Sequence, residues 1–403
     1  SMSTTCPTVT AMAESNIENL DENNDVINGE NEVNDEEEVN DKVDKNEIDN
    51  EEEINDENNS DDLDESIDDI SYENELDLQD ADIALYAVDD VFEVGSLTYK
   101  VLSDDTVQVG DGDTAMTGLS GSVTIPSSVK YGGTTYKVTA IGDRAFLRCS
   151  DITSLEIPDT VTTIGELALA DIGVSTITIP DSVETLGDNV LSGASMTSVT
   201  LSSKLTTIPD RAFNSCPNLR EVTIPDSVTK IETYAFNSCS SLTTITIPKN
   251  VEYIGKQAFW GSALTEVTIE GNSLTEIDDL AFAFCESLKT INIPSSIETI
   301  GEQAFQHCGV LKTTGLETGT SNLTSIGTEA FSSTMIKSIS IPSTCTDINK
   351  NAFTRCSKLQ EINVDEENSK YSSEDGILYD KNKETLYLYP AAKTGSSYTT
   401  PDG

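Results

Sequence analysis

Few arrangements of side chains in this 403-residue chain could carry catalysis. His307 is the only histidine, so a histidine-based metal site or a Ser-His-Asp or Cys-His arrangement is hard to assemble. Acid–base catalysis would then need paired carboxylates, for which Glu221 and Glu266 are candidates. Both stand among Ser and Thr, with no obvious desolvating pocket to raise the pKa of one of them. We interpret them as solvated strand residues and predict no catalytic site.

Two acidic stretches invite comparison with a calcium-binding loop. They are Asp104-Asp105 and Asp111-Gly112-Asp113. The ordered ligands, the central glycine and the distal glutamate of an EF-hand are absent. We therefore interpret both stretches as turns, and the sequence predicts no metal and no cofactor.

Six of the eight cysteines follow a Phe by three residues: Cys149, Cys216, Cys239, Cys285, Cys308 and Cys356. Only Cys6 and Cys345 stand elsewhere. If the copies stack, neighbouring cysteines would approach to about 5 Å, which leaves disulfides open. Other small or apolar residues replace them in further copies, namely Ser262, Thr334, Ile172 and Ala194. This mixture favours a column of buried free thiols over disulfides or zinc.

A 23-residue repeat positions these residues. Ala-Phe recurs at Phe213, Phe236, Phe259, Phe282 and Phe305, with related positions at Phe146, Leu169, Leu191, Phe331 and Phe353. About ten copies therefore occupy residues 140–364. A repeat this short cannot enclose a core alone, so each copy must bury its apolar face against the next in a solenoid.

Each copy divides into two halves. The first ends in Ile-x-Ile-Pro and alternates apolar with polar residues, as in a strand with one buried face. Its inner row is Ile157, Ile179, Ile224, Ile247, Ile293 and Ile341. Stacked copies would give a parallel sheet. The second half predicts a short strand and a helical or 3₁₀ turn carrying Ala-Phe, with glycines permitting a tight bend at Gly142, Gly165, Gly187, Gly255, Gly301 and Gly327.

The consensus Leu-Thr-x-Ile-x-Ile-Pro-x-x-Val-x-x-Ile-Gly-x-x-Ala-Phe-x-x-Cys, represented as far as its Phe by residues 242–259, resembles the BspA-like leucine-rich repeat family of bacterial surface proteins. The resemblance implies a leucine-rich-repeat solenoid and a role in adhesion or other extracellular recognition, without chemistry. Repeat residues are dictated by packing, so the resemblance leaves the ligand open.

Further segments flank the repeats. Residues 89–139 alternate without the full motif and predict a small N-terminal β cap. Residues 365–403 predict a β-hairpin module, followed at Thr399-Thr400-Pro401 by the start of a truncated repeat. Residues 1–13 end in Ala11-Met12-Ala13 and resemble a signal-peptide remnant. A lipidated Cys6 is the less favoured alternative, because no apolar run precedes it.

Residues 14–88 form an acidic segment that we expect to be disordered. Between Glu14 and Asp82 stand 31 acidic residues and two lysines, which supplies 29 of the 49 net negative charges. Such a segment cannot bury enough apolar surface to offset its ordering entropy. It could serve as a self-repelling spacer or simply as a solubilising tail.

The chain's negative charge argues against nucleic acid and anionic membranes as partners. The chain contains no run of 18 apolar residues, so the sequence predicts no membrane span.

The outward positions of the predicted sheet form a hydroxyl-rich face. We name as its candidate binding residues Thr176, Thr178, Ser198, Thr200, Glu221, Thr223, Thr244, Thr246, Glu266 and Thr268. Threonine suits strands in any case, so the pattern alone does not prove a site. The face could bind an extracellular protein or a glycan, although few aromatic residues line it.

The sequence therefore predicts a non-enzymatic, secreted or cell-surface recognition protein. Two alternatives remain open: the substrate-recognition region of a larger secreted enzyme, and a self-associating structural surface protein.

Overall fold

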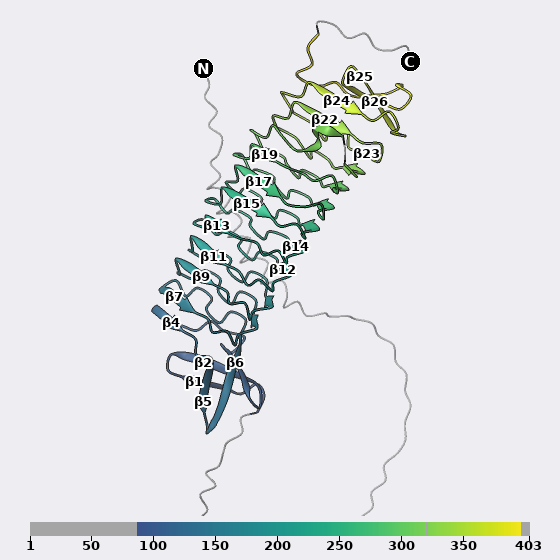
Figure 1. Ribbon diagram of the computed structural model, residues 1–403. Helices are drawn as coiled ribbons and strands as arrows, with labels where there is room; N and C mark the ends of the chain where they lie inside the picture. Colours follow the sequence, from purple (N-terminus) through teal and green to yellow (C-terminus); the bar gives the residue numbers. More distant parts are fainter. Residues whose placement is uncertain (1–86, 320, 396–403) are drawn as a thin grey trace, which may run out of the picture. The chain divides into compact units, whose positions relative to one another are not determined.

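The computed structural model describes residues 87–319 and 321–395 (Figure 1). Within them the repeats form a β-solenoid of about ten coils, each coil being one copy of the repeat. The predicted signal-peptide remnant, nearly all of the acidic segment and the truncated repeat after Thr399 lie outside the described residues.

One wall of the solenoid, which we call the front wall, carries the Ile-x-Ile strands. They are β4 (Gly121–Thr124), β7 (Ile152–Glu156), β9 (Thr176–Thr178), β11 (Ser198–Thr200), β13 (Glu221–Val222), β15 (Thr244–Ile247), β17 (Glu266–Ile269), β19 (Thr290–Ile291), β22 (Ser338–Ile341) and β24 (Glu361–Val364). All pairing among them is parallel. The predicted inner row is buried throughout. The pairing confirms the predicted parallel arrangement. The burial confirms the predicted inner face, because alternating side chains turn one face of each strand to the core.

The front wall is not one continuous sheet. Its strands pair in four groups: β4–β7, β9–β11–β13, β15–β17–β19 and β22–β24. A turn of 3₁₀ helix, η1 (Leu316–Thr318), stands between the last two groups, and it is the only helical element of the described residues. The front wall therefore has interruptions that the repeat pattern did not predict.

The opposite wall, which we call the back wall, consists mainly of two-residue strands. β6 (Thr134–Ile141), β8 (Thr163–Ile164) and β10 (Thr185–Leu186) pair in sequence. A second run contains β12 (Thr207–Ile208), β14 (Lys230–Ile231), β16 (Tyr253–Ile254), β18 (Glu276–Ile277), β20 (Thr299–Ile300), β21 (Ser325–Ile326) and β23 (Asp347–Ile348). This run pairs without interruption across seven coils, so it holds neighbouring coils together where the front wall does not.

The Ala-Phe segments join the two walls and form hydrogen-bonded turns instead of the predicted helical turn. Residues two before and two after the Phe adopt left-handed backbone, for example Leu280 at φ 58° and Phe284 at φ 60° around Phe282. A residue with left-handed backbone cannot continue a right-handed helix, so each Ala-Phe segment remains a short turn. Its amides bond to the next coil instead, as when Phe259 N donates to Ala281 O at 2.8 Å.

The phenylalanine rings of these turns stack through the core. Ring centroids of Phe213 and Phe236 lie 5.0 Å apart, and the column continues through Phe259, Phe282, Phe305, Phe331 and Phe353 with spacings up to 5.7 Å. The interplanar angles do not exceed 13°. Leu169 and Leu191 occupy the same buried position in earlier coils. The column supplies the contact between coils that one repeat cannot provide alone.

The repeated glycines have a different role from the predicted one. None of Gly142, Gly165, Gly187, Gly255, Gly301 and Gly327 has positive φ, so a tight bend does not explain them. A Cβ on Gly255 would instead lie 2.8 Å from the backbone carbon of Glu232 in the preceding coil. A Cβ on Gly301 would lie 2.6 Å from the backbone of Asp278. These glycines permit close approach between coils.

Small β elements cover both ends. At the N-terminal side β1 (Val91–Val94), β2 (Leu97–Ser103), β3 (Thr106–Val109) and β5 (Ser128–Tyr131) enclose stacked aromatic rings, with Phe92 4.3 Å from Tyr131. At the other side β25 (Tyr371–Glu374), β26 (Ile377–Asp380) and β27 (Leu386–Leu388) form an antiparallel sheet. The amide of Ile348 donates to the Tyr371 hydroxyl at 3.0 Å, which ties this sheet to the last coils.

Candidate functional site

The candidate binding residues project from the front wall. Nine of the ten are exposed, and Ser198 is half-buried. Thr176, Ser198 and Glu221 stand opposite one another in β9, β11 and β13, and Thr178 pairs with Thr200. Thr244 pairs with Glu266, and Thr246 with Thr268. The structure therefore brings these residues together in two groups, one on each side of the interruption between β13 and β15.

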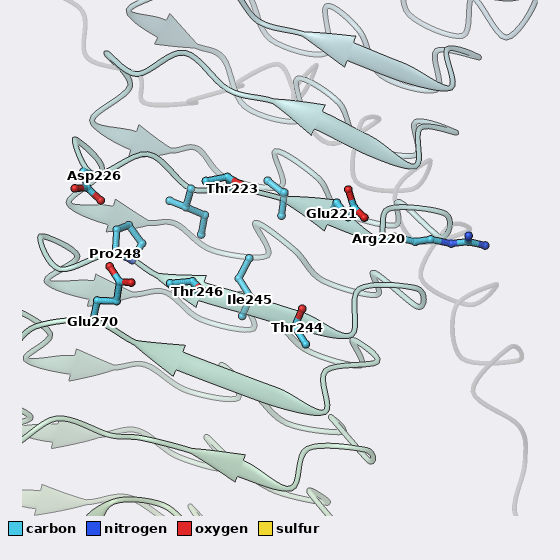
Figure 2. Close-up of a pocket in the computed structure, with 11 residues that line it drawn as sticks. Arg220, Glu221, Thr223, Asp226, Thr244, Ile245, Thr246, Pro248 and Glu270 are labelled. Atoms are coloured by element: carbon cyan, nitrogen blue, oxygen red, sulfur yellow. The ribbon is translucent and has the colours of Figure 1, made fainter.

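At this interruption the front wall is hollowed. The hollow measures about 520 Å³ and is lined by eleven residues of three successive coils: Arg220, Glu221, Val222, Thr223, Ile224, Asp226, Thr244, Ile245, Thr246, Pro248 and Glu270 (Figure 2). Four of the ten candidate residues contribute to it. Sequence reasoning found these four but missed the hollow, because the strand pattern is the same here as in neighbouring coils.

Backbone pairing shows where the sheet opens. In most coils the amide just before the front strand donates to the equivalent carbonyl of the preceding coil. Arg220 bonds to Thr197 at 2.9 Å, and Thr265 bonds to Thr243 at 2.8 Å. Among the described residues, no backbone hydrogen bond connects residues 220–224 with residues 243–247. The back wall stays paired at the same coils, with Lys230 opposite Tyr253.

The floor of the hollow is apolar. Val222 is only half-buried, although the equivalent inward residues Val199, Ile245 and Val267 are buried. Ile245 and Ile224 continue the floor on either side. The missing strand contact thus exposes part of a side chain that the other coils cover.

Carboxylates and hydroxyls form the rim. Figure 2 shows Asp226 and Glu270 at the end near Pro248, and Glu221 at the opposite end with Thr244. Asp226 pairs with Lys249 at 3.0 Å. The Arg220 side chain extends away from the hollow. This arrangement can accept hydrogen bonds and favours positive charge.

The candidates for catalysis are not assembled into a catalytic site. Glu221 and Glu266 stand on β13 and β17, with β15 between them in chain order, and both are exposed. The His307 ring stacks on Phe284 at 4.8 Å, on the Ala-Phe turns and not on the front wall. Within residues 87–319 and 321–395, no group of three or more His, Cys, Asp or Glu side chains could hold a metal ion.

Asp111 belongs to a turn, as the sequence predicted. Its carboxylate accepts hydrogen bonds from the amides of Asp113 and Thr114 at 2.8 and 2.7 Å. Partial burial acts to raise the pKa of Asp111, but the hydrogen bonds from Thr114 and Asp113 outweigh it and the pKa is lowered. The carboxylate is thus occupied by its own loop.

The cysteine column consists of free, buried thiols, which confirms the favoured interpretation. Each Sγ at the repeated position donates to a backbone carbonyl of an earlier segment. Cys216 bonds to Leu191 O at 3.1 Å, and Cys239 bonds to Phe213 O at 3.2 Å. Burial raises the pKa of Cys239 and Cys285 to about 12, so these thiols stay protonated and unreactive at neutral pH.

Aromatic side chains also occur outside the front wall. The Tyr253 hydroxyl donates to Asp278 Oδ2 at 2.6 Å, and the guanidinium of Arg211 lies 4.7 Å from the Tyr234 ring centre. Trp260 packs on Phe284 at 5.4 Å. These rings are therefore engaged with neighbours along the solenoid. No helix of the described residues is long and apolar enough to cross a membrane.

Comparison with known proteins supports this architecture. The sequence model of the BspA type leucine rich repeat region matches six copies, over residues 120–240, 206–320 and 285–383. No curated protein sequence matches the chain.

Solved structures of bacterial leucine-rich repeat proteins are similar. A protein from Bacteroides ovatus is 27% identical over 67% of this chain, with a TM-score of 0.52, and the match spans 64% of that protein's length. A leucine rich cell surface protein from Faecalibacterium prausnitzii is 27% identical over 70% of this chain and 90% of its own, with a TM-score of 0.40. Because the family's repeat model matches most of the chain, the protein belongs to the BspA-type leucine-rich repeat family.

Proposed function

We propose that the protein is a non-enzymatic recognition protein, secreted or displayed at the bacterial cell surface, and that its front wall binds an extracellular protein or glycan in adhesion. The acidic segment would hold the solenoid away from its anchor. The observation that carries the proposal is the pair of in-register groups of mostly exposed Thr, Ser and Glu side chains, one on β9–β11–β13 and one on β15–β17.

The chemistry of this row suits recognition better than catalysis. Within each group the paired strands present hydroxyls and carboxylates in fixed register, which lowers the entropy lost on binding. The solenoid exposes them over several coils, as repeat proteins present extended binding surfaces. The described candidates include no paired catalytic groups, so the front wall offers contacts and not a reaction centre.

Binding of the full chain to immobilised extracellular-matrix proteins and a glycan array tests the proposal. Two front-wall variants should lose binding: Thr223→Lys with Thr246→Lys at the hollow, and Thr178→Lys with Thr268→Lys outside it. The matched control is Thr163→Lys with Thr185→Lys, which places the same charge on exposed strand positions of the back wall. Retained binding in both front-wall variants would reject the front wall as the site, and binding to no member of either panel would count against adhesion.

A further inference from the structure

The hollow between β13 and β15 combines three features that no other part of the front wall shares in the described residues. Its backbone ladder is open, its floor exposes an apolar side chain, and its rim carries carboxylates at both ends. Its volume of about 520 Å³ falls within the range of small-molecule pockets.

Two of the rim carboxylates have no cation. Glu221 and Glu270 form no ion pair with the described residues, whereas Asp226 pairs with Lys249. Arg220 neighbours Glu221 in sequence, but its side chain points away from the hollow. Glu221 and Glu270 therefore stand at the rim without an ion-pair partner among the described residues, above an apolar floor.

A lysine side chain fits this combination. Its four methylene groups are apolar and its end is a compact cation, so the stem can cover Val222 while the ammonium reaches Glu221. A sugar ring would fit less well, because no aromatic side chain lines the hollow to stack against it.

The missing backbone hydrogen bonds between β13 and β15 favour a partner segment in an extended conformation. Along β13 and β15 the facing backbone groups form no hydrogen bonds with each other, so main-chain donors and acceptors remain at the edge of the hollow. An extended peptide presents complementary main-chain groups and alternates its side chains, so one side chain can enter while the next points out.

We propose that this hollow receives a lysine side chain from an extended segment of a protein partner. The inference deepens the proposed function, since it names the partner chemistry for one part of the front wall. Glu221 binds the ammonium, Val222 and Ile245 contact the methylene stem, and the hydroxyls of Thr244 and Thr246 bond to the peptide.

The test is a fluorescence-anisotropy titration of the full chain with a labelled peptide, Gly-Thr-Val-Lys-Val-Thr-amide. A second peptide carries acetyl-lysine, which keeps the stem and removes the charge. The lysine peptide should bind about tenfold more tightly than its acetylated form, and Glu221→Gln should weaken it about threefold to fivefold, as for a partly exposed ion pair. Thr246→Lys, which places a tethered ammonium at the hollow, should compete with the peptide and weaken binding further.

The control variant is Glu361→Gln, which removes the same charge from an exposed strand position on β24, in a paired part of the front wall. It should bind the peptide as the parent does. Equal weakening by Glu221→Gln and Glu361→Gln would mean that the acidic chain attracts the peptide as a whole, and would overturn the proposal. Equal binding of both peptides would overturn it as well.

The outcome is separable from that of the proposed function. Peptide binding at the hollow with no effect of Thr178→Lys and Thr268→Lys on the matrix and glycan panels would support the pocket and reject the wider face. Loss of panel binding in those variants with no specific peptide binding would support the face and reject the pocket.

Discussion

The thiol of Cys285 donates a hydrogen bond to the carbonyl oxygen of Phe259, one coil earlier, with a sulfur–oxygen distance of 3.1 Å. The next copy repeats the contact between Cys308 and Phe282 at 3.1 Å. Where the column contains serine, Ser262 makes the same bond to Phe236 at 2.7 Å. Where the position holds Cys or Ser, the side chain is therefore a small donor that satisfies a buried carbonyl, which explains why Ser can replace Cys there without any redox chemistry.

Replacing Cys285 tests this role. Cys285→Ser should retain the hydrogen bond, whereas Cys285→Ala should lose it and lower the free energy of unfolding by about 1 kcal/mol or more. Urea denaturation followed by circular dichroism measures both. A serine variant less stable than the alanine variant would contradict the assignment, because packing alone would then decide the position.

Thiol reactivity offers a second check. The seven described cysteines are free and buried, and burial raises the pKa of Cys345 to about 12 as well. In the native protein at pH 8 they should resist an aromatic disulfide reagent, because the thiolate is scarce and the reagent cannot reach it. After denaturation all eight cysteines of the chain should react. Fewer than eight reactive thiols in denaturant would indicate disulfides.

Glycine at the back wall should be needed for contact between coils. Gly255→Ala places a Cβ 2.8 Å from the backbone of the preceding coil and should destabilise by about 1–3 kcal/mol, as overpacking does. Gly309→Ala is the control, because a Cβ there meets nothing within 4 Å and the φ angle is not positive. It should be neutral or slightly stabilising. Similar denaturation midpoints for the two variants would reject the close-approach explanation.

The phenylalanine column should tolerate leucine better than alanine. Phe259 stacks between Phe236 and Phe282 at 5.2 and 5.1 Å. Phe259→Ala should cost about 3–5 kcal/mol through lost contacts and a cavity. Phe259→Leu should cost less than half as much, because Leu191 fills the same position in an earlier coil and keeps its backbone bond to Ala212 at 3.0 Å. Thermal unfolding of the two variants decides this, and equal losses would show that ring stacking is indispensable.

The raised pKa of Tyr253 predicts that the folded protein loses stability at alkaline pH. Burial, together with the hydrogen bond to Asp278, raises its pKa well above the ordinary value of 10.0. A group whose folded pKa is raised stabilises the fold fully below its unfolded pKa and loses this contribution as pH rises through the folded value. The denaturation midpoint should therefore fall above about pH 10. In Tyr253→Phe the midpoint should fall less. If it falls as far as in the parent protein, groups other than Tyr253 cause the alkaline loss of stability.

The repeat period, the strand positions and the buried rows follow from the sequence alone. The positions of Ile247 and Phe259 recur at fixed spacing, and each copy of the repeat contains the same local pattern of apolar residues. The Asp111 turn is likewise readable, because its side chain bonds within three residues. The sequence also identified the exposed Thr and Glu positions of the front wall as candidates.

Tertiary structure alone decided the interruption between β13 and β15, the left-handed turns around each Phe, and the contact role of Gly255. Val199 and Val222 stand in the same local pattern, yet the first is buried and the second is half-exposed at the hollow. The difference depends on whether the strand of the next coil pairs, and that distance is set by the stacking of whole coils. No single copy of the repeat encodes it, because the hydrogen-bond partners lie about 23 residues away and are fixed only when the coils pack.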